Sequence, residues 1–115
     1  MRMIEPVRVQ LLLDSLKERE LYVHLEITNG AYTSHHDKSR LVAANFIKNV
    51  PIRYTHGSIS GSGPYRVGLK LERGGWVFAE GLTHYDEHET DRIVLEGHEQ
   101  DGKLVVALLL GPEPF

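Results

Sequence analysis

Residues 61–85 restrict the fold of this chain more than any other stretch, because they have the pattern of a β-hairpin. Residues 65–71 alternate between apolar and polar side chains, Gly74 and Gly75 supply the turn, and residues 76–85 run back. Polar and flexible residues stand among large apolar ones on both predicted strands. We therefore place a candidate site on this hairpin, although no stretch of the sequence encodes a recognisable catalytic or cofactor motif.

Length and composition favour a single globular domain. The chain has 115 residues, of which 41% are hydrophobic and 25% charged, so it can form one domain over residues 1–115 with a real core. The longest apolar run, residues 104–110, is far shorter than the roughly 20 residues that cross a bilayer. We predict a buried strand there and no membrane association.

Charge and cysteine content narrow the possible functions. The formal net charge of −3 and the pI of about 6.1 argue against nucleic-acid binding, which typically needs a basic face. Without cysteine the chain has no disulfide, no thiolate metal site and no thiol nucleophile. Residues 1–9 lack the features of a secretory signal, so we expect a cytoplasmic protein, with no cofactor and no bound metal.

Helical periodicity gives way to strand periodicity after residue 20. Pro6 suits a first helical turn, and apolar residues at helical spacing predict a helix from there to near Arg19. Strands are predicted at residues 21–28, 31–36, 41–48, 52–56, 65–71, 76–85, 93–98 and 104–110. Asn29-Gly30 predicts a hairpin turn, Pro51 belongs at a strand start or sheet edge, and the last strand should be covered on both faces. These elements predict a mainly β fold, a small closed or partly open β-barrel of about eight short antiparallel strands with one N-terminal helix.

The glycine-rich residues 57–63 do not match a phosphate-binding loop. A dinucleotide-binding fingerprint requires Gly or Ala where this chain has Arg66, and a P-loop requires Lys and Ser or Thr where it has Pro64 and Tyr65. No predicted helix follows to offer its N-terminus to an anion. The run instead predicts a bulged or strongly bent entry into the next strand.

His24 and Glu26 share one face of the first long strand, about 6.5 Å apart. An imidazole and a carboxylate at this spacing can share a ligand or a water, as an acid and base pair does. The alternative is a strand face that meets solvent or a partner, and the sequence leaves both open.

Glu80 is the hairpin residue that is hardest to explain. Its neighbours of the same strand parity are all large and apolar: Trp76, Phe78 and Leu82. A carboxylate on an apolar face must be paired or protonated, so we predict Arg66 or Lys70 on the partner strand as its counter-ion. The pair is either a structural salt bridge or the floor of a site, and Arg66 with Lys70 could hold an anion instead.

Two groups have the residue types of a metal site without its geometry. Glu80, His84 and His88 recur at steps of about 13 Å along a strand, and the adjacent His35, His36 and Asp37 point to opposite strand faces. We predict solvated turns for both groups. The predicted ligand or partner face comprises six residues: His24, Glu26, Arg66, Lys70, Glu80 and His84.

The chain also has enough aromatic residues for base stacking on an OB-like barrel: Tyr32, Tyr54, Tyr65, Trp76 and Phe78. Basic residues are not interleaved among them. We therefore predict that these aromatic side chains pack in the core.

Several short motifs occur in order along nearly the whole chain. They are Tyr22 with His24-Leu25-Glu26, the octapeptide at residues 63–70, Trp76, residues 79–83 and Gly102-Lys103-Leu104. In this combination the sequence resembles the YojF-like family of small uncharacterised bacterial proteins. The resemblance implies a compact, mostly β, barrel-like fold with a helical segment. It supplies no catalytic residues, but such proteins look to be encoded beside a deacetylase of low-molecular-weight thiol metabolism, which suggests an accessory role.

Two functions follow from these observations. The first is a non-catalytic accessory or binding module that forms a dimer and presents His24 and Glu26 to a small ligand or to a protein partner of deacetylase type. The second is a small enzyme or ligand-binding barrel, with Glu80 and His24 as acid and base and Arg66 or Lys70 holding an anionic substrate. The second requires these four side chains to lie within roughly 10 Å of one another on one face.

Overall fold

The chain folds into nine strands and one helix over residues 1–29 and 43–115, the part described by a computed structural model. In chain order the elements are β1 (Arg2–Met3), α1 (Pro6–Leu16), β2 (Leu21–Asn29), β3 (Ala43–Ile52), β4 (Tyr54–Gly61), β5 (Tyr65–Leu71), β6 (Trp76–Leu82), β7 (His84–Tyr85), β8 (Ile93–His98) and β9 (Leu104–Gly111). The predicted turn at residue 30, the predicted strand at 31–36 and the group His35, His36 and Asp37 lie outside the described residues.

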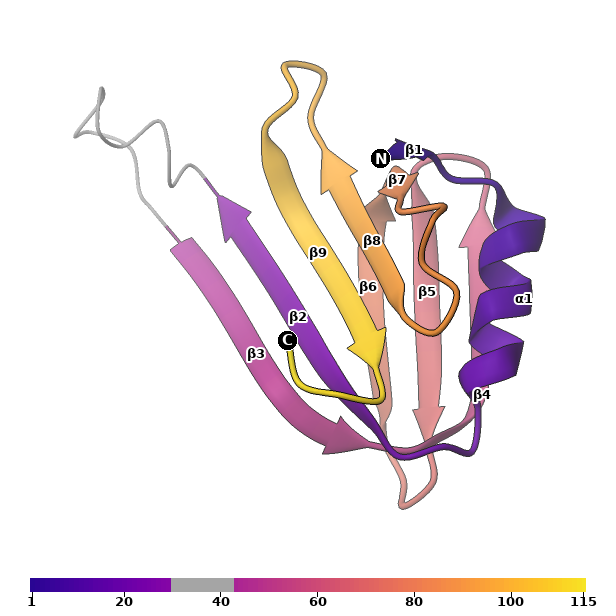
Figure 1. Ribbon diagram of the computed structural model, residues 1–115. Helices are drawn as coiled ribbons and strands as arrows, with labels where there is room; N and C mark the ends of the chain where they lie inside the picture. Colours follow the sequence, from indigo (N-terminus) through magenta and orange to yellow (C-terminus); the bar gives the residue numbers. More distant parts are fainter. Residues whose placement is uncertain (30–42) are drawn as a thin grey trace.

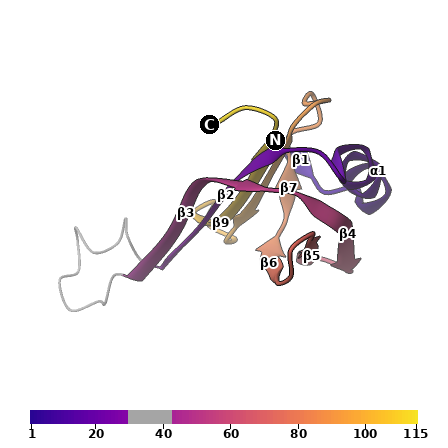
Figure 2. The same ribbon diagram turned by 90° about the horizontal axis from the view of Figure 1, so that it is seen from below.

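The strands make two antiparallel sheets (Figure 1). The larger sheet has six strands in the order β1-β7-β8-β9-β2-β3, and the smaller sheet has three in the order β4-β5-β6. Figure 2 shows the sheets as two layers with α1 beside β4. The six-stranded sheet faces the viewer in Figure 1, and no helix of the described chain covers that face.

The core lies between the two sheets and α1. Alternate residues of β8 and β9 supply its centre, where Ile93, Leu95, Leu108 and Leu110 are almost fully buried. The part of the chain that the structure describes buries no polar or charged residue in this core. Hydrophobic burial of one face of each sheet therefore holds the layers together.

α1 begins at Pro6, as predicted, because the fixed φ of proline suits the first helical position. Its buried residues recur at helical spacing: Val9, Leu13 and Leu16. This face packs on β4 of the smaller sheet and on β8 of the larger sheet, so the helix contacts both layers, and Figure 2 shows it beside β4.

The helix ends before the predicted position near Arg19 because the chain turns sharply after it. Glu18 takes up a left-handed conformation with φ of 61°, and its N–H donates to the carbonyl of Tyr54 at 2.8 Å. The Tyr54 hydroxyl in turn donates to the carbonyl of Leu13 at 2.7 Å. Tyr54 of β4 therefore fixes the end of α1 with two hydrogen bonds, one through its backbone carbonyl and one through its side-chain hydroxyl.

The predicted hairpin is confirmed as β5 and β6, joined by Gly74 and Gly75 at φ of 101° and 88°. Its return strand is shorter than predicted. It ends at Leu82, and after Thr83 the chain continues as β7 in the other sheet. Gly81, at φ of 88°, turns the chain at this point.

Where β6 leaves the smaller sheet, its backbone lies directly against β8. A Cβ placed on Gly97 would overlap the carbonyl oxygen of Gly81 and lie 2.5 Å from Cγ1 of Val106. Only glycine fits at position 97, because the backbones of the two sheets approach there without room for a side chain.

The strands around Pro51 differ from the prediction. β3 runs through Pro51 and ends at Ile52, and β4 then includes most of the glycine-rich run. Pro51 does lie on an edge strand, as predicted, since β3 is the last strand of its sheet. The predicted irregular strand entry is confirmed by a register shift between Tyr65 and Arg66 at the start of β5.

β9 is covered on one face only, so the prediction for residues 104–110 is right in part. Val106, Leu108 and Leu110 are buried toward the core, while Val105 and Leu109 on the other face are half-buried by neighbouring strands. No helix in the described part of the chain is long and apolar enough to span a membrane.

The predicted mainly β architecture with one N-terminal helix is confirmed, but the described strands do not close into a barrel. β1 and β3 are the edges of the larger sheet, and β4 and β6 are the edges of the smaller one. Breaks at Arg53 and Thr83 direct consecutive strands into different sheets, which prevents one continuous sheet. The result is two packed layers.

Candidate functional site

The six predicted site residues lie on two different outer faces of the molecule. The six-stranded sheet carries His24, Glu26 and His84, whereas the three-stranded sheet carries Arg66, Lys70 and Glu80. Along each strand these residues alternate with buried ones, so their side chains point away from the core. The core therefore separates the two groups.

This separation shows that the acid and base hypothesis is wrong. Glu80 and His24 belong to sheets that pack face to face, a spacing of about 10 Å between backbones, and both side chains point outward. A general acid and base must both reach one bound substrate through hydrogen bonds. No single substrate can contact both residues in this fold.

His24 and Glu26 do lie together on the outer face of β2. Nε2 of His24 is 3.7 Å from Oε1 of Glu26, and both side chains are partly buried. Nδ1 of His24 is buried and has no hydrogen-bond partner among the described residues. The imidazole is thus held by its neighbours on the sheet more than by polar contacts.

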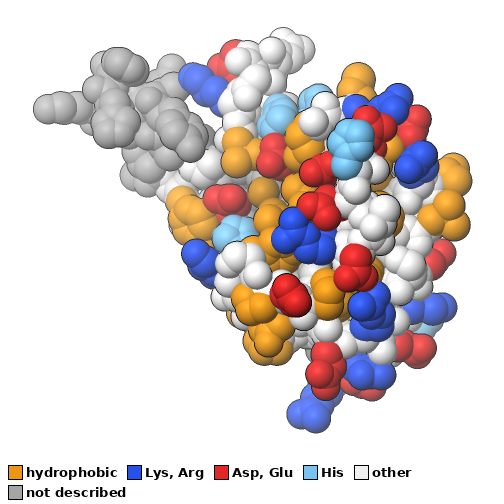
Figure 3. Space-filling view, viewed as in Figure 1, with side chains coloured by type: hydrophobic (Ala, Val, Ile, Leu, Met, Phe, Trp, Pro, Cys, Tyr) orange, Lys and Arg blue, Asp and Glu red, His pale blue; other side chains and the backbone are white. Residues whose placement is uncertain are grey.

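The structure adds a second carboxylate and imidazole pair, which is not among the residues predicted from the sequence. On β8, Oε1 of Glu96 lies 2.7 Å from Nε2 of His98. Its sequence signal is the same two-residue spacing that singles out His24 and Glu26, in reverse order. Glu26 and Glu96 flank Ala107 in register, about 10 Å apart across two strand spacings. Figure 3 shows histidine and acidic side chains mixed with hydrophobic ones on this face.

His84 joins this second pair through ring stacking. Its imidazole stacks on that of His98 with centroids 4.7 Å apart and planes 26° from parallel. Nδ1 of His84 is 2.6 Å from the hydroxyl oxygen of Thr83. The same oxygen accepts a hydrogen bond from the backbone N–H of His98 at 3.0 Å. Across the described residues, no group of three or more His, Asp or Glu side chains is arranged to hold a metal ion.

The outer face of the three-stranded sheet is different, because large aromatic side chains stand exposed on it. Trp76 is 53% exposed and Phe78 is 46% exposed. Their rings stack with centroids 5.4 Å apart and planes 7° from parallel. The Arg66 guanidinium carbon lies 4.2 Å from the Phe78 ring centroid, which is cation–π geometry. We refer to Arg66, Phe78 and Trp76 as the aromatic platform.

A glycine allows the aromatic platform to form. Gly68 pairs with Phe78 across the strands, and a Cβ on Gly68 would lie 2.7 Å from the ring. Phe78 therefore lies over bare backbone, an arrangement that covers an otherwise empty position on a sheet. Gly68 stands between the outward-facing Arg66 and Lys70, while Val67 is buried on the opposite side of β5.

Charged residues surround the aromatic platform. In register, Lys70 is opposite Trp76 and also opposite His56, and Glu80 is opposite Arg66. Glu80 is exposed, so the prediction of a buried carboxylate is wrong, and no salt bridge joins it to Arg66 or Lys70 within the described chain. Parity explains the difference, because Trp76, Phe78 and Glu80 share a face that turns out to be the outer one.

The prediction that the aromatic residues pack in the core holds for only some of them. Tyr54 is fully buried and Tyr65 is partly buried. Trp76 and Phe78 are on the surface, where basic residues do lie beside them on the neighbouring strand. Cross-strand pairing creates this arrangement, which cannot be seen in the linear spacing.

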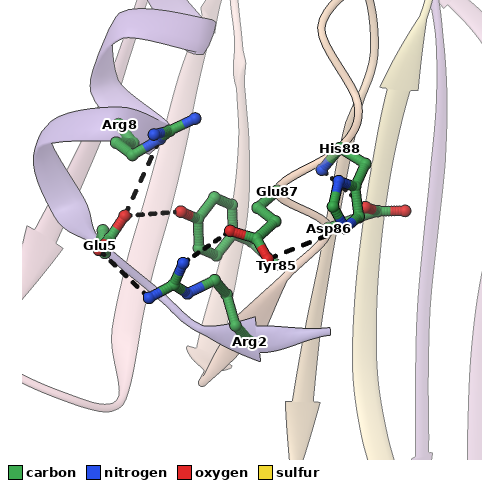
Figure 4. Close-up of polar contacts among 7 residues, drawn as sticks. All are labelled: Arg2, Glu5, Arg8, Tyr85, Asp86, Glu87 and His88. Carbon is green, nitrogen blue, oxygen red and sulfur yellow. Dashed lines mark hydrogen bonds and ion pairs between the residues drawn. The ribbon is translucent and has the colours of Figure 1, made fainter.

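A third group of charged residues joins the N-terminal segment to the loop after β7 (Figure 4). Arg2 donates to Glu87 at 2.7 Å, and the Tyr85 hydroxyl donates to Glu5 at 2.8 Å. The hydrogen bond from Arg2 lowers the pKa of Glu87, and burial followed by the Glu5 contact raises the pKa of Tyr85. Arg8 lies 3.9 Å from Glu5. Because its charges are paired with one another, this group stabilises structure and offers little to a ligand.

Three surface hollows of the described residues lie away from the aromatic platform. One of about 640 Å³ is bordered by Arg53 and Glu72 at the β5–β6 turn, and one of about 670 Å³ by Pro64 and His98. A third, of about 380 Å³, lies between α1 and residues 85–90. None of these three hollows includes a residue of the aromatic platform in the described structure.

Comparison with known proteins places the whole chain beside uncharacterised relatives. The family model described as "Protein of unknown function (DUF1806)" matches residues 3–115. The uncharacterized protein YojF of Bacillus subtilis (strain 168) is 41% identical over 107 residues, which are 93% of this chain and 91% of that protein. The crystal structure of Bacillus subtilis YojF protein covers 99% of this chain and 95% of its own, with a TM-score of 0.81 and 38% identity. These findings confirm the resemblance seen in the sequence motifs.

Proposed function

Because the chain belongs to the DUF1806 family of proteins of unknown function, we propose its function from its surface: it is an accessory module that binds a protein partner through the aromatic platform. The observation that carries the proposal is the exposure of Trp76 and Phe78, stacked with Arg66 on the paired strands β5 and β6. Trp and Arg are among the residues that most often dominate binding energy in protein interfaces.

Burial of this platform supplies a driving force for association. An aromatic side chain presents roughly 150–250 Å², and about half of each platform ring is in water. Covering the two rings would remove roughly 200 Å² of apolar surface from water, worth about 5 kcal/mol before the cost of association. Two χ angles per aromatic ring, already limited by stacking, keep the entropy loss on binding small.

The shape of the face favours a protein over a small molecule. Small-molecule sites are concave and bury most of the ligand surface. The aromatic platform lies on an open three-stranded sheet, outside the three hollows described above. A flat surface with a central aromatic group and a polar rim is typical of protein interfaces.

The charges define the chemistry of the partner. Arg66 and Lys70 flank the rings on β5, His56 follows on β4, and Glu80 is the acidic residue opposite Arg66. We therefore expect the partner to present an apolar centre with carboxylates placed to meet Arg66 and Lys70. A deacetylase of low-molecular-weight thiol metabolism stays the predicted partner, and a lysate of the native host offers it for capture.

Affinity capture followed by a binding measurement tests the proposal. Immobilised wild-type protein and the Trp76→Ala variant are exposed to lysate of the native host, and captured proteins are then purified for direct titration. We expect the variant to lose the partner, with a dissociation constant raised about 30-fold, the size of a hot-spot truncation. Recovery of a deacetylase of low-molecular-weight thiol metabolism would support the predicted partner.

Two matched variants make the result specific. Val7→Ala truncates an apolar side chain that is 74% exposed on α1 and should bind like wild type. His24→Ala tests the predicted polar face on the other sheet in the same assay. The proposal is overturned if Trp76→Ala, folded by circular dichroism, binds the partner as tightly as wild type, or if His24→Ala alone abolishes binding.

A further inference from the structure

We propose that two copies of this chain pair through the edge strand β3, so that their six-stranded sheets form one continuous sheet across a two-fold axis at Asn45. The proposal does not depend on the aromatic platform, which lies on the other sheet. The occupant of the β3 edge is a second copy of the same strand, in antiparallel orientation.

β3 has the features of an edge that needs a partner. Among the described residues it is the last strand of its sheet, which it borders at the left in Figure 1. Phe46 is 61% exposed and Ile47 is 42% exposed, with one side chain on each face of the sheet. A long edge strand with exposed apolar side chains and outward backbone N–H and C=O groups readily pairs with another strand.

The devices that normally protect an edge occur in only one half of β3. Lys48, a bulge at Asn49 with φ of 54°, and Pro51 occupy the half nearest β4. The other half, residues 43–47, contains no charge, no proline and no glycine. This unprotected half is the segment available for pairing.

Residues 43–47 are complementary to their own antiparallel copy. With the two-fold axis at Asn45, Ala44 is opposite Phe46 of the second copy, and Ala43 is opposite Ile47 of the second copy. Ala44 and Phe46 share one face of the sheet, while Ala43 and Ile47 share the other. Each large side chain therefore meets a small one on the same face, as close strand pairing requires.

The exposed area is compatible with a weak dimer. Besides Phe46 and Ile47, Ile27 of β2, which is opposite Asn45, is 48% exposed. Together these three side chains expose on the order of 250 Å² of apolar surface per copy, taking roughly 150–200 Å² for each complete side chain. Two copies would bury roughly 500 Å² of apolar surface, which with the backbone edge is still below the roughly 1,200 Å² of stable interfaces and in the range of weak complexes. An interface of this kind is isologous, which the two-fold axis satisfies.

Cysteine crosslinking tests the register, because the natural chain has no cysteine. In Asn45→Cys the two thiols would face each other across the axis, with Cβ atoms about 4.5–5.5 Å apart, which a small local movement of the two strands brings into the roughly 3.5–4.5 Å range of a disulfide. We expect mild oxidation to give a covalent dimer at low protein concentration. Lys103→Cys, in the exposed β8–β9 turn, is the control and should give none under the same conditions.

Sedimentation equilibrium tests the interface without a crosslink. Wild type should show a concentration-dependent dimer. Phe46→Lys should raise the dissociation constant of this dimer more than about 10-fold, and Val7→Lys should leave that constant unchanged. Trp76→Ala should also stay dimeric, which separates this result from any failure of partner binding. Three results would overturn the proposal. The first is a wild-type protein that stays monomeric at about 100 μM, well above the expected micromolar dissociation constant. The others are a folded Phe46→Lys variant that dimerises like wild type and an Asn45→Cys variant that does not crosslink.

Discussion

The contact between Gly97 and Gly81 yields the sharpest stability prediction, because it joins the two sheets through backbone alone. In Gly97→Ala the new Cβ would overlap the carbonyl oxygen of Gly81 and lie 2.5 Å from Cγ1 of Val106. The Gly81 backbone is already turned at φ of 88° and cannot move without displacing the end of β6. The two sheets must therefore separate locally to admit one methyl group.

The magnitude follows from two opposing effects. Replacing glycine by alanine stabilises a protein by about 0.4–1 kcal/mol through the unfolded state when the native site has room. Overpacking a filled site costs about 1–3 kcal/mol, and more when backbone must move. We expect Gly97→Ala to lower the free energy of unfolding by about 2 kcal/mol, which for this chain length lowers the melting temperature by about 8 °C.

Gly68→Ala is the matched control, because its new Cβ also meets a neighbour. That neighbour is the Phe78 ring at 2.7 Å, which is half exposed and can rotate toward solvent. We expect a loss below about 1 kcal/mol for Gly68→Ala. Urea unfolding followed by far-ultraviolet circular dichroism measures both variants. A Gly97→Ala protein within about 0.5 kcal/mol of wild type would refute the tight junction between the sheets.

Three further predictions concern the core and the N-terminal ion pairs. Tyr54→Phe removes the hydroxyl that donates to the Leu13 carbonyl and should cost about 1–2 kcal/mol in urea unfolding; no loss would mean that water satisfies this carbonyl equally well. Leu108→Ala, at the fully buried centre of β9, should cost about 2–5 kcal/mol, and a smaller loss would indicate that the core collapses into the space. The pKa of Glu87 is lowered from 4.5 by the hydrogen bond from Arg2, so its contribution to stability is complete above that pH and is lost as pH falls through the lower folded value. Glu87→Gln should therefore be less stable than wild type near neutral pH and equal to it in acid, whereas parallel pH profiles of the urea midpoint would contradict this assignment.

The secondary structure could be predicted from the sequence where the signal is local. Pro6 and the spacing of Val9, Leu13 and Leu16 identify the helix, and Gly74-Gly75 identifies the central hairpin. These features depend on backbone conformations of a few adjacent residues, which the residue types themselves restrict. The helix ends at Leu16, before the predicted end near Arg19, because the Glu18 N–H donates to a carbonyl of β4, which is distant in sequence.

The candidate site could be predicted only as groups of residues that share a strand face. Alternation correctly puts Arg66 with Lys70, and His24 with Glu26. Alternation does not say which face of a strand points inward. The sequence therefore predicts an interior position for Glu80, Trp76 and Phe78, whereas the structure exposes all three. The pair of Glu96 with His98 has the same spacing as His24 with Glu26 and could have been found by applying one rule to both strands.

By itself, the sequence determined a mainly β chain with an N-terminal helix, a hairpin turned by Gly74-Gly75, and the family to which the chain belongs. Only the tertiary structure decided that the strands form two sheets, and that His24 and Glu80 therefore lie on opposite outer faces. It also decided that Phe78 stacks between Trp76 and Arg66 in water. The reason is physical: local pattern specifies the conformation and parity of a strand, whereas its neighbours and its buried face depend on pairing between residues far apart in the chain.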